Sequence, residues 1–213
     1  MAGLQSPKPP LIAPLEPMDE LPEEPVFDGL HVLDVLDWPD YDGDHWQIDA
    51  SKVERSMLAG MTFERLKLWD SILVRTDISA AKCFDAGILR TELLGCRMSG
   101  TQLGESSLKD VTFENCKLDL VSFRKCRLER VVFRNCVLDE ADFIGATLID
   151  VVFLQCELRQ TDFNRAHCTR VDMTRSDLSD IKGVTSLKNV RIKPEQMMTL
   201  APLLCAEVGF TLE

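Results

Sequence analysis

The sequence predicts an all-β solenoid in which the chain turns a corner every five residues. An aromatic or leucine side chain stands at every fifth position from Phe113 to Phe163, a period that belongs to neither an α-helix nor a flat strand. The position two residues earlier holds a small side chain in almost every unit, so each unit has one bulky and one small inward position. Internal repetition of this kind decides the fold before any helix or strand is assigned.

The repeat runs over residues 61–182. Its central positions, every fifth residue from Phe63 to Leu178, are apolar at all twenty-four places. In a chain that is 45% apolar, such a run in a single phase does not arise by chance. Three outward positions separate the inward ones, which predicts a corner in each unit and a core along the axis. The predicted core includes Phe113, Phe123, Phe133, Phe143, Phe153 and Phe163.

The repeat unit also carries a recognisable motif. The unit Ala141-Asp142-Phe143 reads as Ala-(Asp or Asn)-(Leu or Phe)-x-x, and the units that begin at Thr161 and Ser176 are close variants of it. In this the chain resembles the pentapeptide-repeat family over about 122 of its 213 residues. The resemblance implies a right-handed quadrilateral parallel β-helix with four units, and so twenty residues, in each coil. Residues 61–182 would then wind about six coils.

Outward residues test the twenty-residue coil independently of the repeat. Six positions spaced by twenty alternate strictly in charge, which predicts a ladder of stacked ion pairs. Each exposed pair contributes only about 0–1 kcal/mol, but together the pairs fix the register because a slipped coil would lose them. The ladder consists of Asp70, Arg90, Asp110, Arg130, Asp150 and Arg170.

Two stretches of different character precede the repeat. Residues 1–25 hold seven prolines among several acids, and we expect a flexible, partly extended arm because so little apolar surface cannot offset the entropy of ordering. This arm is either a solubilising tail or a segment that binds a partner. Residues 26–60 predict an N-terminal cap made of a strand, a turn-rich loop and the first weak repeats.

The five-residue phase fails at Gly183, and residues 183–213 follow the coil. Their apolar segment begins at Pro194 and stops at Gly209, which are helix start and stop signals. Because a β-helix leaves its last coil open, we expect this helix to form a C-terminal cap. The alternative is a homodimer through residues 194–208, since an apolar helix face serves either role.

The sequence predicts no catalytic, cofactor or metal site, and so a protein that is not an enzyme. The three histidines lie in unrelated regions, and the chain has neither a phosphate-binding glycine loop nor zinc-ligand spacing. Four cysteines spaced by twenty fall in one inward column, which is typical of small core side chains and not of a tetrahedral zinc site. They are Cys96, Cys116, Cys136 and Cys156.

Charge and hydropathy indicate which classes of partner and which cellular compartment to expect. The net charge of −11 disfavours direct binding of nucleic acid, and most of it belongs to the first sixty residues. Residues 61–182 hold nineteen acids and eighteen bases, so the coil itself is nearly neutral. No apolar run is long enough to cross a bilayer and no signal peptide is evident. We therefore expect a cytoplasmic protein without membrane contact.

A rigid coil with varied outward side chains predicts a protein-interaction scaffold. Its protein partner, which the sequence does not identify, would bind an outward face of the coil or the acidic arm. The candidate interaction surface gathers five basic residues around one coil, although most of them have an acid stacked above or below. These residues are Arg124, Lys125, Arg127, Arg130 and Arg134.

The family resemblance implies an alternative function. Some pentapeptide-repeat proteins resemble B-form DNA in size and charge, bind type II topoisomerases and protect them from quinolone drugs. On this hypothesis the chain is a DNA mimic that modulates DNA gyrase or topoisomerase IV. The nearly neutral coil departs from the anionic rod that DNA mimicry needs, and a shared fold does not by itself confer a function.

Overall fold

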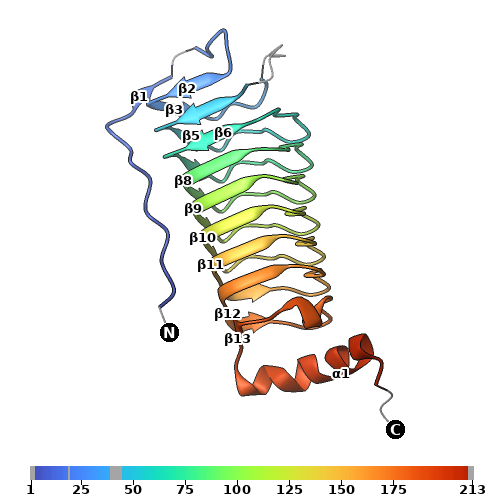
Figure 1. The fold of residues 1–213 in the computed structure, drawn as a ribbon. Coiled ribbons are helices and arrows are strands. Elements are labelled where there is room, and N and C mark those ends of the chain that lie inside the picture. The colour runs from blue at the N-terminus through green and yellow to red at the C-terminus, as the bar shows by residue number, and fades with distance from the viewer. Residues whose placement is uncertain (1–2, 19, 39–44, 211–213) are drawn as a thin grey trace.

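A computed structural model describes residues 3–18, 20–38 and 45–210 of the chain. The chain winds about a single axis into a solenoid of about eight turns, and one helix follows at the C-terminal end (Figure 1). The strands pair in parallel throughout, as in β9 with β10 and β10 with β11. The all-β solenoid that the five-residue repeat predicts is confirmed.

The described residues form thirteen strands in one hydrogen-bonded sheet that wraps around the axis. From β4 onward a residue generally pairs with the residue twenty positions later, as Val111 pairs with Val131 and Val131 with Val151. The strands are β1 (Glu16–Pro17), β2 (Val26–Asp28), β3 (Leu30–Leu33), β4 (Gln47–Asp49), β5 (Lys52–Glu54), β6 (Lys67–Trp69), β7 (Ile72–Val74), β8 (Gly87–Leu94), β9 (Ser107–Glu114), β10 (Arg127–Arg134), β11 (Thr147–Glu157), β12 (His167–Asp177) and β13 (Val190–Arg191).

The solenoid has more turns than the six counted over residues 61–182, because it begins earlier in the chain. β2 and β3 pair in parallel with β4 and β5, which pair in turn with β6 and β7. In the first of these steps Val26 pairs with Gln47, an offset of 21 residues, whereas Gln47 pairs with Lys67 at an offset of 20. One additional residue between β3 and β4 therefore hides the first turns from a search for a strict period.

The corners lie where the five-residue period predicts them. Nearly every fifth residue has a positive φ, as at Arg90 (47°), Leu120 (57°) and Arg130 (54°). A left-handed residue reverses the local curl of the backbone, and four of them in each twenty residues close a four-sided turn. The conformation is unfavourable for a side chain with a Cβ by about 1–2 kcal/mol. The inter-turn hydrogen bonds made around each corner must offset this, as when the N–H of Lys125, another left-handed residue, donates to the carbonyl of Ile144 at 2.9 Å.

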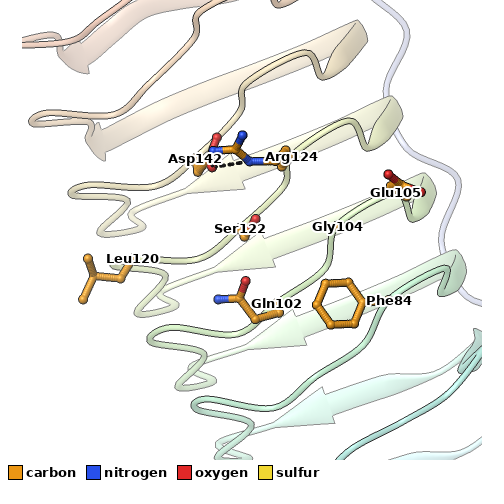
Figure 2. A pocket seen from close by; sticks show the side chains of 8 residues that line it. All are labelled: Phe84, Gln102, Gly104, Glu105, Leu120, Ser122, Arg124 and Asp142. Carbon is orange, nitrogen blue, oxygen red and sulfur yellow. Dashed lines mark hydrogen bonds and ion pairs between the residues drawn. The ribbon is translucent and has the colours of Figure 1, made fainter.

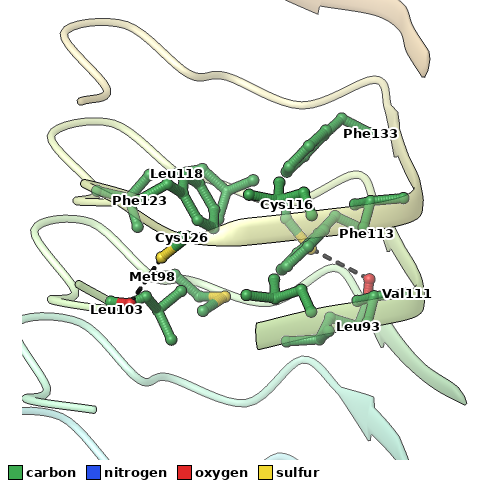
Figure 3. Close-up of a cluster of buried hydrophobic side chains, with 14 of the residues drawn as sticks. Leu93, Met98, Leu103, Val111, Phe113, Cys116, Leu118, Phe123, Cys126 and Phe133 are labelled. Carbon is green, nitrogen blue, oxygen red and sulfur yellow. Dashed lines mark hydrogen bonds between the residues drawn. The ribbon is translucent and has the colours of Figure 1, made fainter. Parts of the chain in front are cut away.

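Phenylalanine rings fill the middle of the coil in two parallel stacks. Phe133 lies 4.9 Å from Phe113 and 5.0 Å from Phe153 between ring centroids, with nearly parallel planes. The second stack repeats this with Phe143, which lies 4.8 Å from Phe123 and 5.2 Å from Phe163. Rings of the two stacks meet edge to face across the axis (Figure 3). All six rings are buried, and they exclude water from the whole central section.

The small inward positions contribute hydrogen bonds as well as space. The Sγ of Cys116 donates to the carbonyl of Leu93, and the Oγ1 of Thr161 donates to that of Leu138, each 23 residues earlier in the chain. Seven of the eight cysteines are buried and all are free thiols. Burial raises the pKa of Cys83 and of Cys126 to about 12, so these thiols are protonated core side chains.

The C-terminal segment covers the last turn. It comprises the 3-10 turns η1 (Val184–Ser186) and η2 (Pro194–Gln196) on either side of β13, and then helix α1 (Met197–Val208). Leu200 of α1 is buried against the core, while Gln196 donates to the carbonyls of Met173 and Ser176 at 2.9 and 2.8 Å. Glu207 accepts the N–H of Val184 at 2.8 Å. Among the described residues, no helix is long and apolar enough to span a membrane.

The N-terminal arm lies alongside the coil, where the sequence predicts a flexible segment. Residues 3–18 run extended past successive turns (Figure 1), with Gln5 beside Asp150 of a later turn and Leu11 beside Asp70 of an earlier one. β1 then pairs with β3, where Glu16 aligns with Leu30. The composition of the arm argues against a core of its own, but the arm has no need of one, because the coil supplies the surface on which it packs.

Candidate functional site

The charged ladder follows one corner of the coil, where Asp70, Arg90, Asp110, Arg130, Asp150 and Arg170 all have a positive φ. Each arginine donates two hydrogen bonds to the carboxylate of the aspartate in the preceding turn. Arg130 donates to the two carboxylate oxygens of Asp110 at 2.6 and 2.9 Å, and Arg170 donates to those of Asp150 at 2.5 and 2.6 Å. Arg90 makes the same bidentate contact with Asp70. The six residues thus form three separate pairs, in each of which the arginine lies one turn after its aspartate.

The three aspartates are buried and yet charged. Asp110 and Asp150 are 3% and 2% exposed, and Asp70 is 8% exposed. The hydrogen bonds from Arg90 and Arg170 hold the pKa values of Asp70 and Asp150 below their usual range, against the opposing effect of burial. At Asp110 burial is the largest influence, but Arg130 and the backbone N–H of Lys8 together outweigh it and lower the pKa. These carboxylates are therefore ionised at neutral pH.

The five basic residues of the candidate interaction surface do not form one unpaired patch. Arg127, Arg130 and Arg134 lie on β10, whereas Arg124 and Lys125 precede that strand. Each has an acidic partner: Arg124 with Asp142 at 2.7 Å, Lys125 with Glu105 at 2.8 Å, Arg127 with Glu129 at 3.4 Å, Arg130 with Asp110 at 2.6 Å and Arg134 with Glu114 at 3.5 Å. Their charge is compensated within the coil, so this surface offers little attraction to an anionic partner.

A hollow of about 410 Å³ borders the candidate interaction surface, which contributes Arg124 to its lining, but the sequence did not predict the hollow itself (Figure 2). Its apolar walls are Phe84 and Leu120, which are 53% and 55% exposed. Phe84 lies over Gly104, one turn later, where an added Cβ would stand 3.4 Å from the ring. A sequence signal was present, because Phe84 and Gly104 are an outward aromatic and a glycine twenty residues apart.

Polar groups complete the hollow. Gln102 and Ser122 lie between the apolar walls, and the Arg124–Asp142 ion pair closes one end (Figure 2). Leu120 occupies a left-handed corner, which turns its side chain outward at the rim. The walls therefore offer apolar contact area, with hydrogen-bonding groups and a fixed charge pair at the edge. This combination is typical of a surface that binds another protein.

The hollow is lined by one hydroxyl, that of Ser122, and by two carboxylates that are already engaged elsewhere. Asp142 accepts hydrogen bonds from Arg124 and from the N–H of Ile144, and Glu105 pairs with Lys125. Across residues 3–18, 20–38 and 45–210, no group of three histidine, cysteine, aspartate or glutamate side chains is placed to hold a metal ion.

Comparison with known proteins agrees with this architecture. Residues 106–182 match the family model described as a pentapeptide repeat region. No curated protein matches the sequence.

Several solved pentapeptide-repeat structures are similar to this one. HetL, a pentapeptide repeat protein involved in heterocyst differentiation regulation in the cyanobacterium Nostoc sp. strain PCC 7120, is 14% identical, with a TM-score of 0.45 over 77% of this chain and 85% of that one. A trypsin-treated variant of QnrB1, a plasmid-mediated fluoroquinolone resistance protein, is 19% identical, with a TM-score of 0.48 over 92% and 95%. The chain thus carries a pentapeptide repeat region over residues 106–182, in the later turns of its coil.

Proposed function

We propose that this protein is a non-enzymatic interaction scaffold and that it binds a protein partner at the hollow beside Phe84. The observation that carries the proposal is the exposed aromatic ring itself. Phe84 stands at an outward position and keeps about half of its surface in water, whereas the coil buries the six phenylalanines of its two stacks completely. An exposed aromatic side chain next to a second exposed apolar one is the usual centre of a protein–protein contact.

The walls of the hollow define the partner's chemistry. Phe84 and Leu120 favour an apolar side chain inserted between them, and the Gln102 and Ser122 side chains favour polar groups around it. The Arg124–Asp142 pair lies at the edge, where it contributes more to orientation than to affinity. The partner therefore presents an apolar anchor within a polar rim. Truncation of the aromatic residue at the centre of such a contact typically costs about 2 kcal/mol or more of binding free energy, which lowers the affinity about 30-fold.

Affinity capture with two matched variants tests the proposal. Phe84→Ala removes the ring from the hollow, and Met57→Ala truncates a side chain of similar exposure, 49%, elsewhere on the coil. Both changes lie on the surface, so both variants should fold. We expect the full-length protein and Met57→Ala to retain the same partner from a lysate and Phe84→Ala to lose it. Equal recovery by all three proteins would remove the hollow from the interaction.

The topoisomerase hypothesis is supported by family resemblance alone, and the charge pattern of the coil disfavours it. Many carboxylates of the coil, such as Asp110, Glu105 and Asp142, are paired with an arginine or lysine. A DNA mimic needs such acids unpaired. A supercoiling assay with purified DNA gyrase separates the two functions, because a scaffold of another partner leaves both the gyrase activity and its drug sensitivity unchanged.

Self-association through the C-terminal helix is part of the same proposal. α1 buries Leu200 against the coil but leaves Met198 and Val208 exposed. One side of the helix therefore covers the last turn, and another side exposes apolar side chains to solvent. We propose that a second copy covers the open face. Sedimentation equilibrium should then show a dimer that Met198→Glu dissociates, and a wild-type protein that sediments as a monomer at micromolar concentration would contradict this.

A further inference from the structure

The N-terminal arm binds the ladder through its own backbone. The N–H of Lys8 donates to a carboxylate oxygen of Asp110 at 3.1 Å, and the N–H of Leu11 donates to Asp70 at 3.0 Å. The N–H of Gln5 donates to Asp150 at 3.4 Å. Donors three residues apart in the arm thus meet acceptors forty residues, or two turns, apart in the coil. Each aspartate receives one arm amide in addition to its arginine.

The spacing of these contacts follows from the geometry of the two partners. A polyproline II segment advances about 3.1 Å per residue, and therefore about 9.3 Å in three residues. Stacked strands lie about 4.8 Å apart, so two turns of the coil advance about 9.6 Å. The two repeats coincide to within a few tenths of an ångström. An extended proline-rich peptide therefore stays in register with all three aspartates, which are every second residue of the ladder.

The arm's side chains obey the same three-residue repeat. Leu4, Pro7 and Pro10 are half-buried, and each immediately precedes a residue that donates its N–H. Ser6 and Pro9, the third members of the first two repeats, are exposed. The arm thus presents one packing residue, one donor and one outward residue in each turn, which is the facing pattern of a polyproline II helix on a flat surface.

Prolines occur in the arm only where a donor is unnecessary. Pro14 and Pro17 would be the next residues of the donor series after Leu11, and both lack an N–H. The ladder column continues toward the N-terminus with Ala50 and Gly29, which have no carboxylate to receive one. The contacts from arm amides to coil carboxylates therefore end where the acids of the column end.

The groove under the arm is not filled completely. A cavity of about 190 Å³ separates arm residues 6–9 from the coil, whose side of it includes Thr112, Val132 and Asp110. From Ile72 to Asp172, four of the six outward residues in the column along this face are β-branched, namely Ile72, Thr112, Val132 and Val152; the other two are Glu92, which also lines the cavity, and Asp172. The methyl groups of the four β-branched residues beside a row of buried carboxylates provide both contacts that a polyproline II ligand needs: packing for its rings and acceptors for its free amides.

We propose that the face formed by Asp70, Asp110 and Asp150 with the neighbouring β-branched column is a binding site for proline-rich peptides in the polyproline II conformation. The ligand must carry a free backbone N–H at every third residue. The N-terminal arm occupies the site until such a segment of a partner protein displaces it. The site is distinct from the hollow beside Phe84, so this inference does not rest on the proposed function. Because the arm is tethered, it competes at a high effective concentration and keeps the site closed to weak ligands.

Proline substitution in the full-length protein opens the site for a test. The triple variant Gln5→Pro, Lys8→Pro, Leu11→Pro loses the three donors of the arm while proline keeps the extended backbone. The probe is a fluorescein-labelled peptide with the sequence of residues 3–18, and fluorescence anisotropy measures its binding. We expect the triple variant to bind the probe at least tenfold more tightly than the unsubstituted protein, in which the arm covers the site.

Two further probes identify the contact that carries binding. A probe with the same three prolines should bind the triple variant at least tenfold more weakly, whereas a probe with Ser6→Pro, changed at an exposed residue between two donors, should bind as the unsubstituted one does. Circular dichroism checks that the coil of the triple variant is intact. A second variant, Leu4→Glu with Pro7→Glu and Pro10→Glu, releases the arm by removing its packing and repeats the measurement.

The proposal fails under any of three results. The first result is that neither variant binds the probe more tightly than the unsubstituted protein does. The second is that the probe with three prolines binds as well as the unsubstituted probe. The third result is a variant that dimerises by exchanging arms and excludes the probe, because the site would then belong to a second copy of this chain and not to a peptide of another protein.

Discussion

The backbone N–H of Lys8 donates to the carboxylate of Asp110 at 3.1 Å, although the two residues are 102 positions apart in the sequence. The same carboxylate accepts two hydrogen bonds from Arg130. Asp110 therefore links the arm to two successive turns of the coil. Removing or neutralising this carboxylate should disturb the arm and the coil together.

Replacing Asp110 with alanine should destabilise the protein more than replacing a surface acid. The change removes the bidentate partner of the Arg130 guanidinium, which is 13% exposed and then keeps only its contact with Glu129, and a buried charge that loses a partner is costly. We expect the free energy of unfolding to fall by about 2–3 kcal/mol in urea titration.

Glu105→Ala is the matched control, because the pair of Glu105 with Lys125 also spans one turn but lies in solvent. Its midpoint should change much less. If the two variants unfolded at the same urea concentration, the burial of the Asp110–Arg130 pair would not contribute to stability.

The arm should detach in acid. The folded-state pKa values of Asp70, Asp110 and Asp150 are lowered, so their contribution to stability is fully present above the unfolded value of about 3.9 and is lost as the pH falls through the lowered folded values. Below about pH 4, the amide proton of Lys8 should exchange faster with solvent, and its NMR resonance should shift. The amide of Ser6 provides the internal control. A Lys8 resonance that remained unchanged down to pH 2 would contradict the contact.

Truncating a phenylalanine in the middle of a stack should be severe. Phe133→Ala removes the ring that contacts Phe113 and Phe153 and leaves a cavity in a closely packed core. The expected loss is about 3–5 kcal/mol in the free energy of unfolding. Phe84→Ala, at the exposed ring, should cost far less in the same denaturation experiment, and a similar loss for both variants would mean that burial in the stack is not the source of the stability.

The thiols should divide into one reactive and seven protected groups. Cys205 on α1 is partly exposed, whereas the seven cysteines of the coil are buried. Burial raises the pKa of Cys83 to about 12, so little reactive thiolate forms at neutral pH. Titration of the native protein with a thiol reagent should therefore modify about one group, and all eight after unfolding. Rapid labelling of several thiols in the native state would show that the coil opens.

The candidate sites were only partly accessible from the sequence. The ladder positions and the acids paired with Lys125, Arg130 and Arg134 followed from counting by twenty, because stacked turns put such residues next to each other. The partners of Arg124 and Arg127 lie at other spacings and did not follow from it. The direction of pairing did not follow, since an alternating column allows Asp110 to pair with Arg90 or with Arg130. The hollow at Phe84 was missed because it depends on the shape left by Gly104, not on residue type.

The sequence by itself determined the coil, because a five-residue period constrains every unit in the same way and each unit contacts only its neighbours in the stack. Its core phenylalanines and its twenty-residue register could be read directly. Only the tertiary structure decided where the coil begins and what the arm does. A single additional residue before β4 breaks the period without breaking the winding. The arm has no core of its own, so its order arises from carboxylates far along the chain, a contact between two repeats that no local pattern encodes.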